Sequence, residues 1–157
     1  PGQGTEFHVY LPVVKSSFDQ QETRTEEPIR GGTEQVLLVD DEEAIISMEK
    51  QMLLRLGYSV VSHTSSVEAL EVFRANPDKF DIVITDMAMP NMSGDKLAYE
   101  LKKIRPDIPI LLCTGFSEKM SEEKEKPLGI KGFLMKPIVR RELSNMVREV
   151  LDEEQGK

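Results

Sequence analysis

The residues of this chain that can do chemistry stand at the ends of short apolar runs. They are Asp40 and Asp41 after residues 36–39, Asp86 after residues 82–85, Thr114 after residues 110–113, and Lys136 after residues 132–135. Together they offer carboxylates, a hydroxyl and an ammonium group. Carboxylate oxygens are ligands that hard divalent cations prefer, and hydroxyl and ammonium groups donate hydrogen bonds to phosphoryl oxygens. This set of groups therefore suits a divalent cation and a phosphoryl group.

The apolar runs before these residues predict where the side chains meet. Each run is rich in apolar residues, and helix-like segments separate one run from the next. Runs of this kind are typical of buried strands in a parallel sheet. Because ligands bind beyond the carboxyl ends of the strands in an open parallel sheet, we expect the polar residues to converge on one edge of the sheet.

Three of the converging residues, Asp40, Asp41 and Asp86, are acidic and are expected to lie close together. Carboxylates at short range repel one another, and a divalent cation relieves that repulsion. Oxygen ligands with bound water suit Mg²⁺, for which Mn²⁺ can substitute. The main-chain carbonyl of Ala88, just beyond Asp86, is the expected further ligand. The sequence therefore predicts a magnesium site.

Asp86 is the expected nucleophile of this site. A carboxylate beside a divalent cation can attack phosphorus and form an aspartyl phosphate. Lys136 is expected to hold one phosphoryl oxygen as a point charge, and the Thr114 hydroxyl is expected to donate to another. Each residue alone is a weak signal, because an Asp after a strand is often only a helix cap. All of them in this order form a much more specific signal.

Strands and helices are predicted to alternate from residue 34 onward. The expected strands cover residues 36–39, 58–61, 80–85, 109–113 and 131–134, and the expected helices cover residues 42–56, 65–75, 94–104, 117–126 and 139–151. Right-handed crossovers place the helices of such repeated βα units on both faces of the sheet. The predicted fold class is α/β, with a doubly wound, five-stranded parallel sheet.

Apolar stripes at helical spacing predict the buried faces of these helices. The stripe residues are Ile45, Met48, Met52 and Leu56 in the first helix, Val67, Leu70 and Phe73 in the second, and Leu143, Met146, Val147, Val150 and Leu151 in the last. Residues spaced by three and four lie on one face of a helix, so each stripe is expected to face the sheet.

Composition limits the classes of function. The chain has 157 residues, 39% of them hydrophobic, and a formal net charge of −8. That length fits one domain with an appended segment, and the acidic balance disfavours binding to nucleic acid, which needs clustered Lys and Arg. No apolar stretch approaches the length of a membrane span, so no direct membrane contact is expected. Cys113, the only cysteine, lies in an apolar run, and a cytoplasmic location is expected.

From residue 34 to about residue 151 the sequence resembles the receiver domains of two-component response regulators, which share a (βα)5 flavodoxin-like fold. The matching positions are the acidic pair Asp40 and Asp41, the acceptor position Asp86 with Met89, Pro90 and Gly94 beyond it, Thr114, and Lys136 with Pro137. The resemblance implies that Asp86 accepts a phosphoryl group from a phosphohistidine. It implies Asp41 as a direct Mg²⁺ ligand and Asp40 as a ligand through water. The implied partner is a phosphohistidine-bearing kinase domain or a histidine phosphotransfer protein.

The same resemblance implies a switch, in which Thr114 moves toward the phosphoryl group and Phe133 rotates inward with it. Receivers often carry Tyr where this chain has Phe133, so signalling through a tyrosine hydroxyl is absent here. Many receivers carry Ala where this chain has Gly115, and glycine allows a more mobile loop at that position. A core aromatic that only packs is the alternative interpretation of Phe133.

The first residues have a different character. Residues 5–14 alternate apolar and polar side chains as a half-buried strand does, and residues 15–33 have the composition of a flexible linker. The opening run Gly2-Gln3-Gly4-Thr5-Glu6-Phe7, with Tyr10-Leu11-Pro12 after it, is similar to the end of histidine-kinase ATP-binding domains. We therefore expect a terminal strand of such a domain in residues 1–14 and a receiver domain in residues 34–154.

This arrangement implies that the parent protein is a hybrid sensor histidine kinase, which can itself be anchored in a membrane. Because the chain lacks an initiator Met, we expect it to be a fragment of a longer protein. The fragment is expected to catalyse its own phosphorylation and dephosphorylation without turning over an external substrate.

Two other functions stay open at this point. A pseudo-receiver would bind a partner without being phosphorylated, although such a module does not need the full acidic, hydroxyl and lysine set. A phosphohydrolase that forms an aspartyl phosphate usually has a second acid two residues after its nucleophile, and Ala88 occupies that position here. A phosphoacceptor receiver fits all of the motifs.

Overall fold

Residues 4, 7–10, 29–115 and 129–156 are described by the structure, which is a computed structural model. Its elements, in chain order, are β1 (Gln35–Val39), α1 (Glu43–Arg55), β2 (Ser59–His63), α2 (Ser66–Ala75), a 3-10 helix (Pro77–Lys79), β3 (Ile82–Asp86), α3 (Gly94–Ile104), β4 (Ile110–Thr114), β5 (Ile130–Met135) and α5 (Arg140–Gln155). The helix predicted over residues 117–126 lies outside the described residues.

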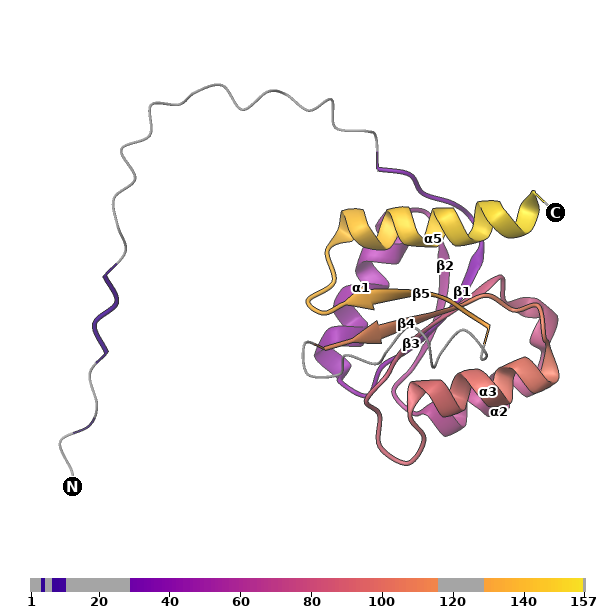
Figure 1. Cartoon of the computed structure of the whole chain (residues 1–157), viewed down its shortest axis with the longest axis horizontal. Helices are drawn as coiled ribbons and strands as arrows, with labels where there is room; N and C mark the ends of the chain where they lie inside the picture. The colour runs from indigo at the N-terminus through magenta and orange to yellow at the C-terminus, as the bar shows by residue number, and fades with distance from the viewer. Residues whose placement is uncertain (1–3, 5–6, 11–28, 116–128, 157) are drawn as a thin grey trace.

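The five strands form one parallel sheet in the order β2-β1-β3-β4-β5. The chain runs from β1 outward to β2 and then returns to the other side of β1, where β3, β4 and β5 follow. The point at which the strand order reverses therefore lies between β1 and β3. Helices α1 and α5 cover one face of the sheet, and α2 and α3 cover the other (Figure 1). The predicted doubly wound α/β fold is confirmed.

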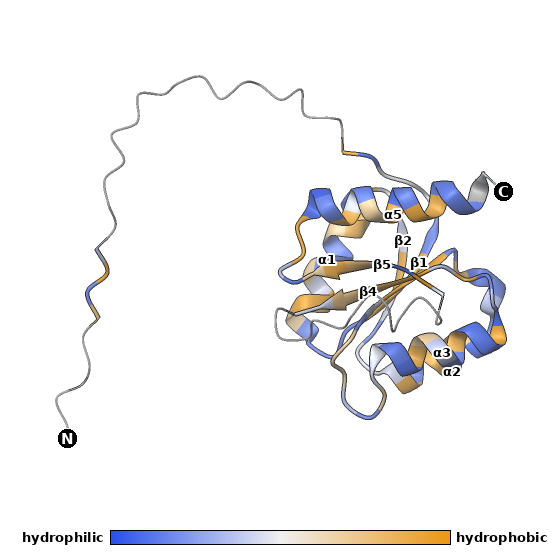
Figure 2. Ribbon diagram, viewed as in Figure 1, coloured by the Kyte–Doolittle hydropathy of each residue, from blue (hydrophilic) through white to orange (hydrophobic). Residues whose placement is uncertain are grey.

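Burial explains why the central strands lack an alternation of polar and apolar residues. Every residue of β3 and β4 is buried, and so is all of β1 after its first residue. The edge strands β2 and β5 are mostly half-buried. A strand covered by helices on both faces has no side that meets solvent, so apolar residues follow one another without interruption. Figure 2 shows hydrophobic colour concentrated in the strands and on the inner faces of the helices.

The buried face of α1 differs from the predicted one. Ile46, Glu49 and Leu53 are buried, whereas Met48, a member of the predicted stripe, is 42% exposed. The two sets of positions differ by one residue, which is a rotation of about 100° around the helix axis. Because α1 carries apolar residues on neighbouring faces, periodicity alone did not identify the buried one. The difference matters because it turns the side chain of Glu49 into the interior.

The predicted stripe of α5 is confirmed, and that of α2 is partly wrong. The buried stripe residues of α5 are Leu143, Val147, Val150 and Leu151, with Met146 partly buried. In α2, Leu70 and Phe73 are buried, but Val67 is 46% exposed and Ala69 faces the core in its place. Among the described helices, none is both long and apolar enough to cross a membrane.

Strands β3 and β4 each end one residue later than predicted, and they begin two residues and one residue later, respectively. Asp86 is the last residue of β3, and Thr114 is the last residue of β4. The register pairs Asp86 with Cys113 and Thr114 with Met135. Both polar residues are buried, with exposed fractions of 5% for Asp86 and 6% for Thr114. Their side chains therefore project from residues of the hydrogen-bonded sheet itself.

Residues 7–10 form no strand, and their side chains are exposed. Phe7 is 87% exposed and Val9 is 80% exposed, although the alternating pattern predicted a buried apolar face. A strand needs a neighbour that pairs with its backbone and covers its apolar side. The described part of this chain supplies no such neighbour to residues 7–10.

Residues 30–32, which precede β1, form hydrogen bonds with the end of α1 and with α5. The Gly32 N–H donates to the Leu56 carbonyl with an N···O distance of 3.0 Å. The Ser144 hydroxyl of α5 donates to the Arg30 carbonyl at 2.5 Å. Between these contacts the backbone passes so close to α1 that a Cβ atom on Gly31 would lie 1.9 Å from the Leu56 oxygen. Glycine is therefore required at this crossing.

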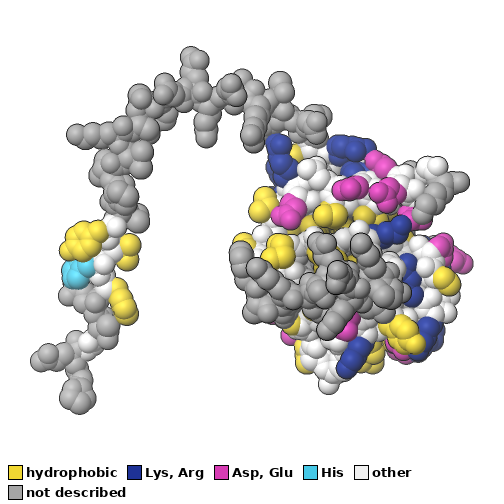
Figure 3. Space-filling model, viewed as in Figure 1, with side chains coloured by type: hydrophobic (Ala, Val, Ile, Leu, Met, Phe, Trp, Pro, Cys, Tyr) yellow, Lys and Arg dark blue, Asp and Glu magenta, His cyan; other side chains and the backbone are white. Residues whose placement is uncertain are grey.

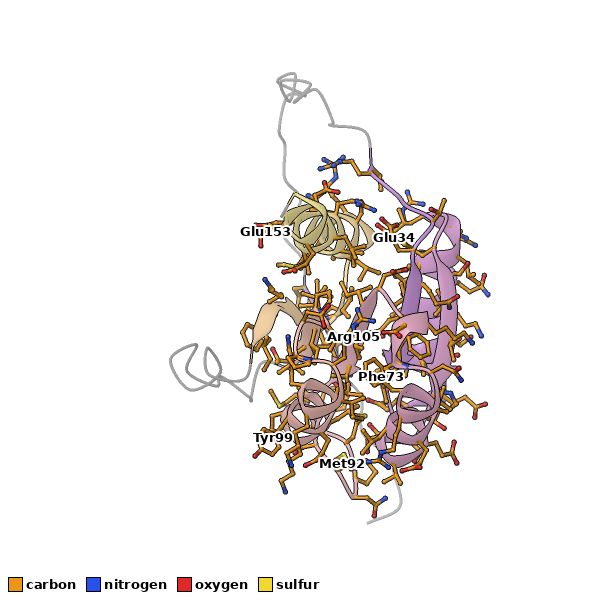
Figure 4. All side chains as sticks on the ribbon, turned by 90° about the vertical axis from the view of Figure 1, so that its right-hand side faces the viewer. Glu34, Phe73, Met92, Tyr99, Arg105 and Glu153 are labelled. Carbon is orange, nitrogen blue, oxygen red and sulfur yellow. The ribbon has the colours of Figure 1, made fainter. Side chains whose placement is uncertain are left out.

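A cluster of ion pairs also attaches residues 30–34 to α5. Arg148 Nη1 lies 2.7 Å from Glu34 Oε1, and its Nη2 lies 2.5 Å from Asp152 Oδ1. Asp152 also pairs with Arg30 at 2.5 Å. Figure 3 shows basic and acidic side chains mixed around α5, and Figure 4 shows Glu34 beside that helix. Residues 30–34 thus pack against the same body as the sheet.

Candidate functional site

Lys136 lies between two carboxylates at the carboxyl edge of the sheet. Its Nζ is 2.7 Å from Asp40 Oδ2 and 2.5 Å from Asp86 Oδ1. Asp40 follows β1, Asp86 ends β3 and Lys136 follows β5. The ends of three strands therefore bring together residues that are far apart in the sequence. The two carboxylates come from the strands on either side of the point where the strand order reverses, where a ligand site is expected in this class of sheet.

The remaining oxygen of each carboxylate is held by the backbone. Asp40 Oδ1 accepts a hydrogen bond from the Glu42 N–H at 2.8 Å, and Asp86 Oδ2 accepts one from the Ala88 N–H at 3.0 Å. Both carboxylates are nearly inaccessible, with exposed fractions of 1% for Asp40 and 5% for Asp86. Because both oxygens of each group have a donor, the two side chains are fixed in orientation.

The charge of Lys136 is stabilised by these partners. Burial alone would lower the pKa of its ammonium group, but the hydrogen bonds to Asp40 and Asp86 outweigh burial and raise the pKa above its ordinary value. Lys136 therefore stays positively charged throughout the physiological pH range. It supplies a fixed cation where a phosphoryl group would bring further negative charge.

Glu49 is a buried acid near this cluster that sequence reasoning missed. Burial raises the pKa of its carboxyl group to about 7, the negative charge of Asp40 adds to the increase, and the positive charge of Lys136 opposes it. The sequence signal that could have revealed this residue is the pair Ile46 and Leu53, which are spaced by seven and lie on the same face of α1 as Glu49.

Thr114 stands at the end of β4, beside the cluster. Its hydroxyl lies 3.3 Å from the Met135 sulfur, and its carbonyl accepts a hydrogen bond from the Lys136 N–H at 2.8 Å. A thioether is only a weak acceptor. The hydroxyl can therefore exchange this contact for a stronger acceptor at little cost.

Phe133 and Gly115 are the two positions at which the sequence departs from the commonest receiver pattern. Phe133 is a half-buried residue of β5 and pairs with Leu112 of β4 in the sheet. Among the described residues, no atom other than those of its chain neighbours lies within 4 Å of a Cβ atom placed on Gly115, so these residues leave room for alanine.

The predicted metal ligands are Asp40, Asp41, Asp86 and the carbonyl of Ala88. Asp41 is half-buried and Ala88 is exposed, and within the described ranges no three or more His, Cys, Asp or Glu side chains lie together as a metal site. Mg²⁺ commonly takes only one or two protein carboxylates and keeps several waters. Asp40 and Asp86, two fixed oxygen donors at one edge of the sheet, fit that requirement.

Gly94 allows α3 to begin directly against the end of β3. Its N–H donates to the Met87 carbonyl at 3.0 Å. A Cβ atom at this position would lie 2.2 Å from the Asp86 carbonyl oxygen, which is closer than any side chain tolerates. The glycine therefore sets the path of the loop that carries Ala88 past Asp86.

The sequence matches the family model described as the response regulator receiver domain over residues 36–148. It is 34% identical to the sensor kinase CckA of Brucella abortus over 162 residues, which cover 98% of this chain and 17% of that protein. It is also 34% identical to the two-component response regulator ARR10 of Arabidopsis thaliana, over 74% of this chain and 21% of that protein. The chain thus spans only a small part of the length of these relatives.

Solved structures show the same architecture. A response regulator receiver domain protein from Clostridium thermocellum is 31% identical, with a TM-score of 0.74 over 78% of this chain and 97% of that one. The chemotaxis protein CheY4 of Vibrio cholerae is 29% identical, with a TM-score of 0.67 over 76% of this chain and 99% of that one. Receiver domains typically bind Mg²⁺. The family match covers most of the chain and includes every residue of the cluster at the sheet edge, so this chain belongs to the response regulator receiver family of two-component systems.

Proposed function

We propose that this receiver takes a phosphoryl group from a phosphohistidine onto Asp86, with the help of Mg²⁺. The observation that carries the proposal is the position of Asp86. It is a buried carboxylate at the end of a central strand, paired with Lys136 and close enough to Asp40 to share that lysine. Two buried carboxylates thus share a single lysine at this edge of the sheet.

Transfer to Asp86 exchanges one phosphorus bond for another. The bond between phosphorus and the donor imidazole nitrogen breaks as a bond forms between phosphorus and an Asp86 oxygen, and the nitrogen keeps the electron pair. Lys136 then offers its ammonium to a phosphoryl oxygen in place of the carboxylate oxygen that it binds now. The Thr114 hydroxyl donates to another phosphoryl oxygen, since its contact with Met135 is weak.

Asp40, Asp41, Asp86 and the carbonyl of Ala88 are the groups we propose as holders of the metal. Mg²⁺, for which Mn²⁺ can substitute, supplies positive charge that offsets the charge of the phosphoryl oxygens. Asp41 adds a third carboxylate to the two buried ones, and the Ala88 segment is already bound to Asp86 through its N–H. Oxygen-only donors of this kind favour a hard cation.

We further propose that Thr114 and Phe133 carry the change in Asp86 to the surface. Thr114 ends the strand that pairs with β5, and Phe133 lies on β5 three residues before Lys136. A movement of the Thr114 side chain toward the phosphoryl group leaves room that the half-buried ring of Phe133 can enter. This switch is the element through which a partner would sense phosphorylation.

The parent protein is proposed to be a hybrid sensor histidine kinase. The similarity to the Brucella sensor kinase extends over 98% of this chain and so includes residues before the receiver match. Under this proposal, residues 1–14 end a kinase ATP-binding domain, residues 15–33 link it to the receiver, and the protein acts in the cytoplasm. Its partners are then a phosphohistidine-bearing kinase domain or a histidine phosphotransfer protein, with no role for nucleic acid.

Phosphorylation by a small donor tests the proposal. Incubation with acetyl phosphate and Mg²⁺ should raise the mass of the intact chain by one phosphoryl group, and chelation of the metal should prevent the increase. The variant Asp86→Asn should remain unmodified, whereas Asp95→Asn, in the first turn of α3, should behave as the wild type. A mass increase in the Asp86→Asn variant would show that the acceptor is another residue. Wild-type chain that neither gains mass nor shows Mg²⁺-dependent NMR shifts near Asp41 would favour a pseudo-receiver.

A further inference from the structure

Glu49 is 2% exposed, yet within the described part of the chain no hydrogen bond or ion pair to its carboxyl group is found. It lies between Ile46 and Leu53 on the buried face of α1. Its carboxyl oxygens are not among the fully enclosed polar atoms that lack a hydrogen-bond partner, so they keep some access to solvent. The low exposure of the side chain still makes ionisation of this carboxyl group costly. An apolar side chain at this position would avoid the cost, so the presence of a carboxyl group here points to a functional role.

Glu49 and Lys136 line the same pocket. This pocket, between α1 and the segment after β5, has a volume of about 370 Å³, and its lining residues are Ile45, Met48, Glu49, Lys136, Pro137 and Ile138. Only Glu49 and Lys136 among them carry charge. Because the other walls are apolar, an ammonium and a carboxylate attract each other here more strongly than they would in water.

The charges at the sheet edge already act on Glu49. Its pKa is raised to about 7 mainly by burial, with Asp40 and Asp86 adding to the increase and Lys136 opposing it. The Cys113 thiol of β4 also interacts electrostatically with Glu49, and burial raises the pKa of this thiol well above its ordinary value, so it stays neutral. The carboxyl group thus responds to any rearrangement of the three charged residues at the edge.

We propose that Glu49 is a positioning residue for Lys136, an inference that rests on the proposed function. In the present arrangement Asp40 and Asp86 hold the ammonium of Lys136. When Asp40 serves as a metal ligand and Asp86 carries a phosphoryl group, neither carboxylate is free to hold the Lys136 ammonium in this way.

Among the described residues, Glu49 is the only acidic side chain that lines this pocket with Lys136. Its carboxylate therefore takes over as the partner that keeps the ammonium against the phosphoryl oxygens. In this way the cost of burying Glu49 is balanced by a function in the phosphorylated state.

The variant Glu49→Gln tests this role, because glutamine has nearly the same shape but carries no charge. The matched control is Glu71→Gln, which removes an exposed acid from α2. Wild type and both variants are phosphorylated with acetyl phosphate and Mg²⁺ at about pH 8, where Glu49 is ionised. Uptake and loss of the phosphoryl group are followed by intact mass, and the ε-carbon signal of Lys136 is followed by NMR.

We expect Glu49→Gln to slow both uptake and loss about fivefold or more, and Glu71→Gln to change neither. The Lys136 signal should differ between wild type and Glu49→Gln when both are phosphorylated. The difference should be much smaller in the metal-free, unphosphorylated proteins, where Asp40 and Asp86 hold the lysine in both. A Glu49→Met variant, which also lacks the charge but fills the site with an apolar side chain, should behave like Glu49→Gln.

Unchanged rates together with coinciding Lys136 signals in the phosphorylated proteins would overturn the positioning role. Those outcomes are distinct from a failure of the proposed function, in which the wild type itself takes up no phosphoryl group. The latter result would overturn the proposed function and this inference together.

Discussion

At the scale of single residues, the site is a balance of buried charges. Lys136 pairs with both Asp40 and Asp86, and these hydrogen bonds outweigh burial and raise its pKa, so it does not lose its proton near neutral pH. Glu49 differs from these residues because burial and neighbouring negative charge raise its pKa to about 7. Its charge therefore changes within the physiological range, while that of Lys136 does not.

The pH dependence of stability should reveal Glu49. Its folded-state pKa of about 7 lies above the ordinary value of 4.5, so the folded state holds this proton more tightly than the unfolded state does. Ionised Glu49 therefore lowers the free energy of unfolding as pH rises from about 4.5 to about 7, by up to about 3 kcal/mol. In metal-free chain, Glu49→Gln should be more stable than wild type at about pH 8 and nearly equal at about pH 5.

Urea unfolding at the two pH values measures this difference directly. The control Glu71→Gln should change the free energy of unfolding by no more than about 0.5 kcal/mol at either pH, since Glu71 is exposed. An effect of Glu49→Gln that is the same at both pH values would mean that Glu49 is not buried as an ionisable group.

At the scale of elements, the loop between β3 and α3 determines the surroundings of Asp86. Gly94 lets the first turn of α3 approach the Asp86 carbonyl, and the Met87 carbonyl accepts the Gly94 N–H. By contrast, the described residues leave open space around Gly115, the residue after β4. The structure leaves no room for a side chain at Gly94 but does leave room at Gly115. Alanine variants at the two positions should therefore have different effects.

Gly94→Ala should destabilise the domain by about 1–3 kcal/mol, because its Cβ atom would force the loop away from Asp86. It should also slow phosphorylation by acetyl phosphate, since Ala88 and Asp86 would lose their present alignment. Gly115→Ala should change stability by less than about 0.5 kcal/mol. Thermal unfolding and the rate of mass increase check both statements, and equal behaviour of the two variants would contradict the role given to Gly94.

Most of the elements could be predicted from the sequence because the central strands are covered on both faces. Uninterrupted Val, Ile and Leu runs of this length are typical of such buried strands, and the order of acidic, hydroxyl and lysine residues identified the edge of the sheet. The rotation of α1 could not be predicted, because Ile46 and Met48 make neighbouring faces equally apolar. Only tertiary packing selects the face that contains Glu49, so a residue close to the site was missed.

At the scale of the whole molecule, the chain before β1 is part of the folded body. Arg30, Gly32 and Glu34 bind α1 or α5 at the end of the sheet opposite Lys136. We propose that the receiver begins at about residue 30, four residues before the boundary expected from composition. Composition could not show this, because the attachment depends on residues of α5 that lie more than a hundred positions away.

Arg148→Met tests this attachment. Arg148 is buried and pairs with both Glu34 and Asp152, so its loss should destabilise the domain by about 2–4 kcal/mol. Hydrogen exchange of the amides in residues 30–34 should become faster as well. Arg74→Met breaks an exposed pair with Glu71 and should cost less than about 1 kcal/mol without affecting that exchange. Unchanged exchange in Arg148→Met would show that other contacts hold the segment.

The most direct test of the central claim is the location of the phosphoryl group. Borohydride reduces an aspartyl phosphate to homoserine, so the reduced residue can be found by peptide mass spectrometry after treatment with acetyl phosphate and Mg²⁺. We predict reduction at Asp86 alone, and none when the metal is chelated. Reduction at another residue would contradict the assignment of Asp86 as the acceptor. The absence of any reduced residue after prolonged incubation with the donor would contradict it as well.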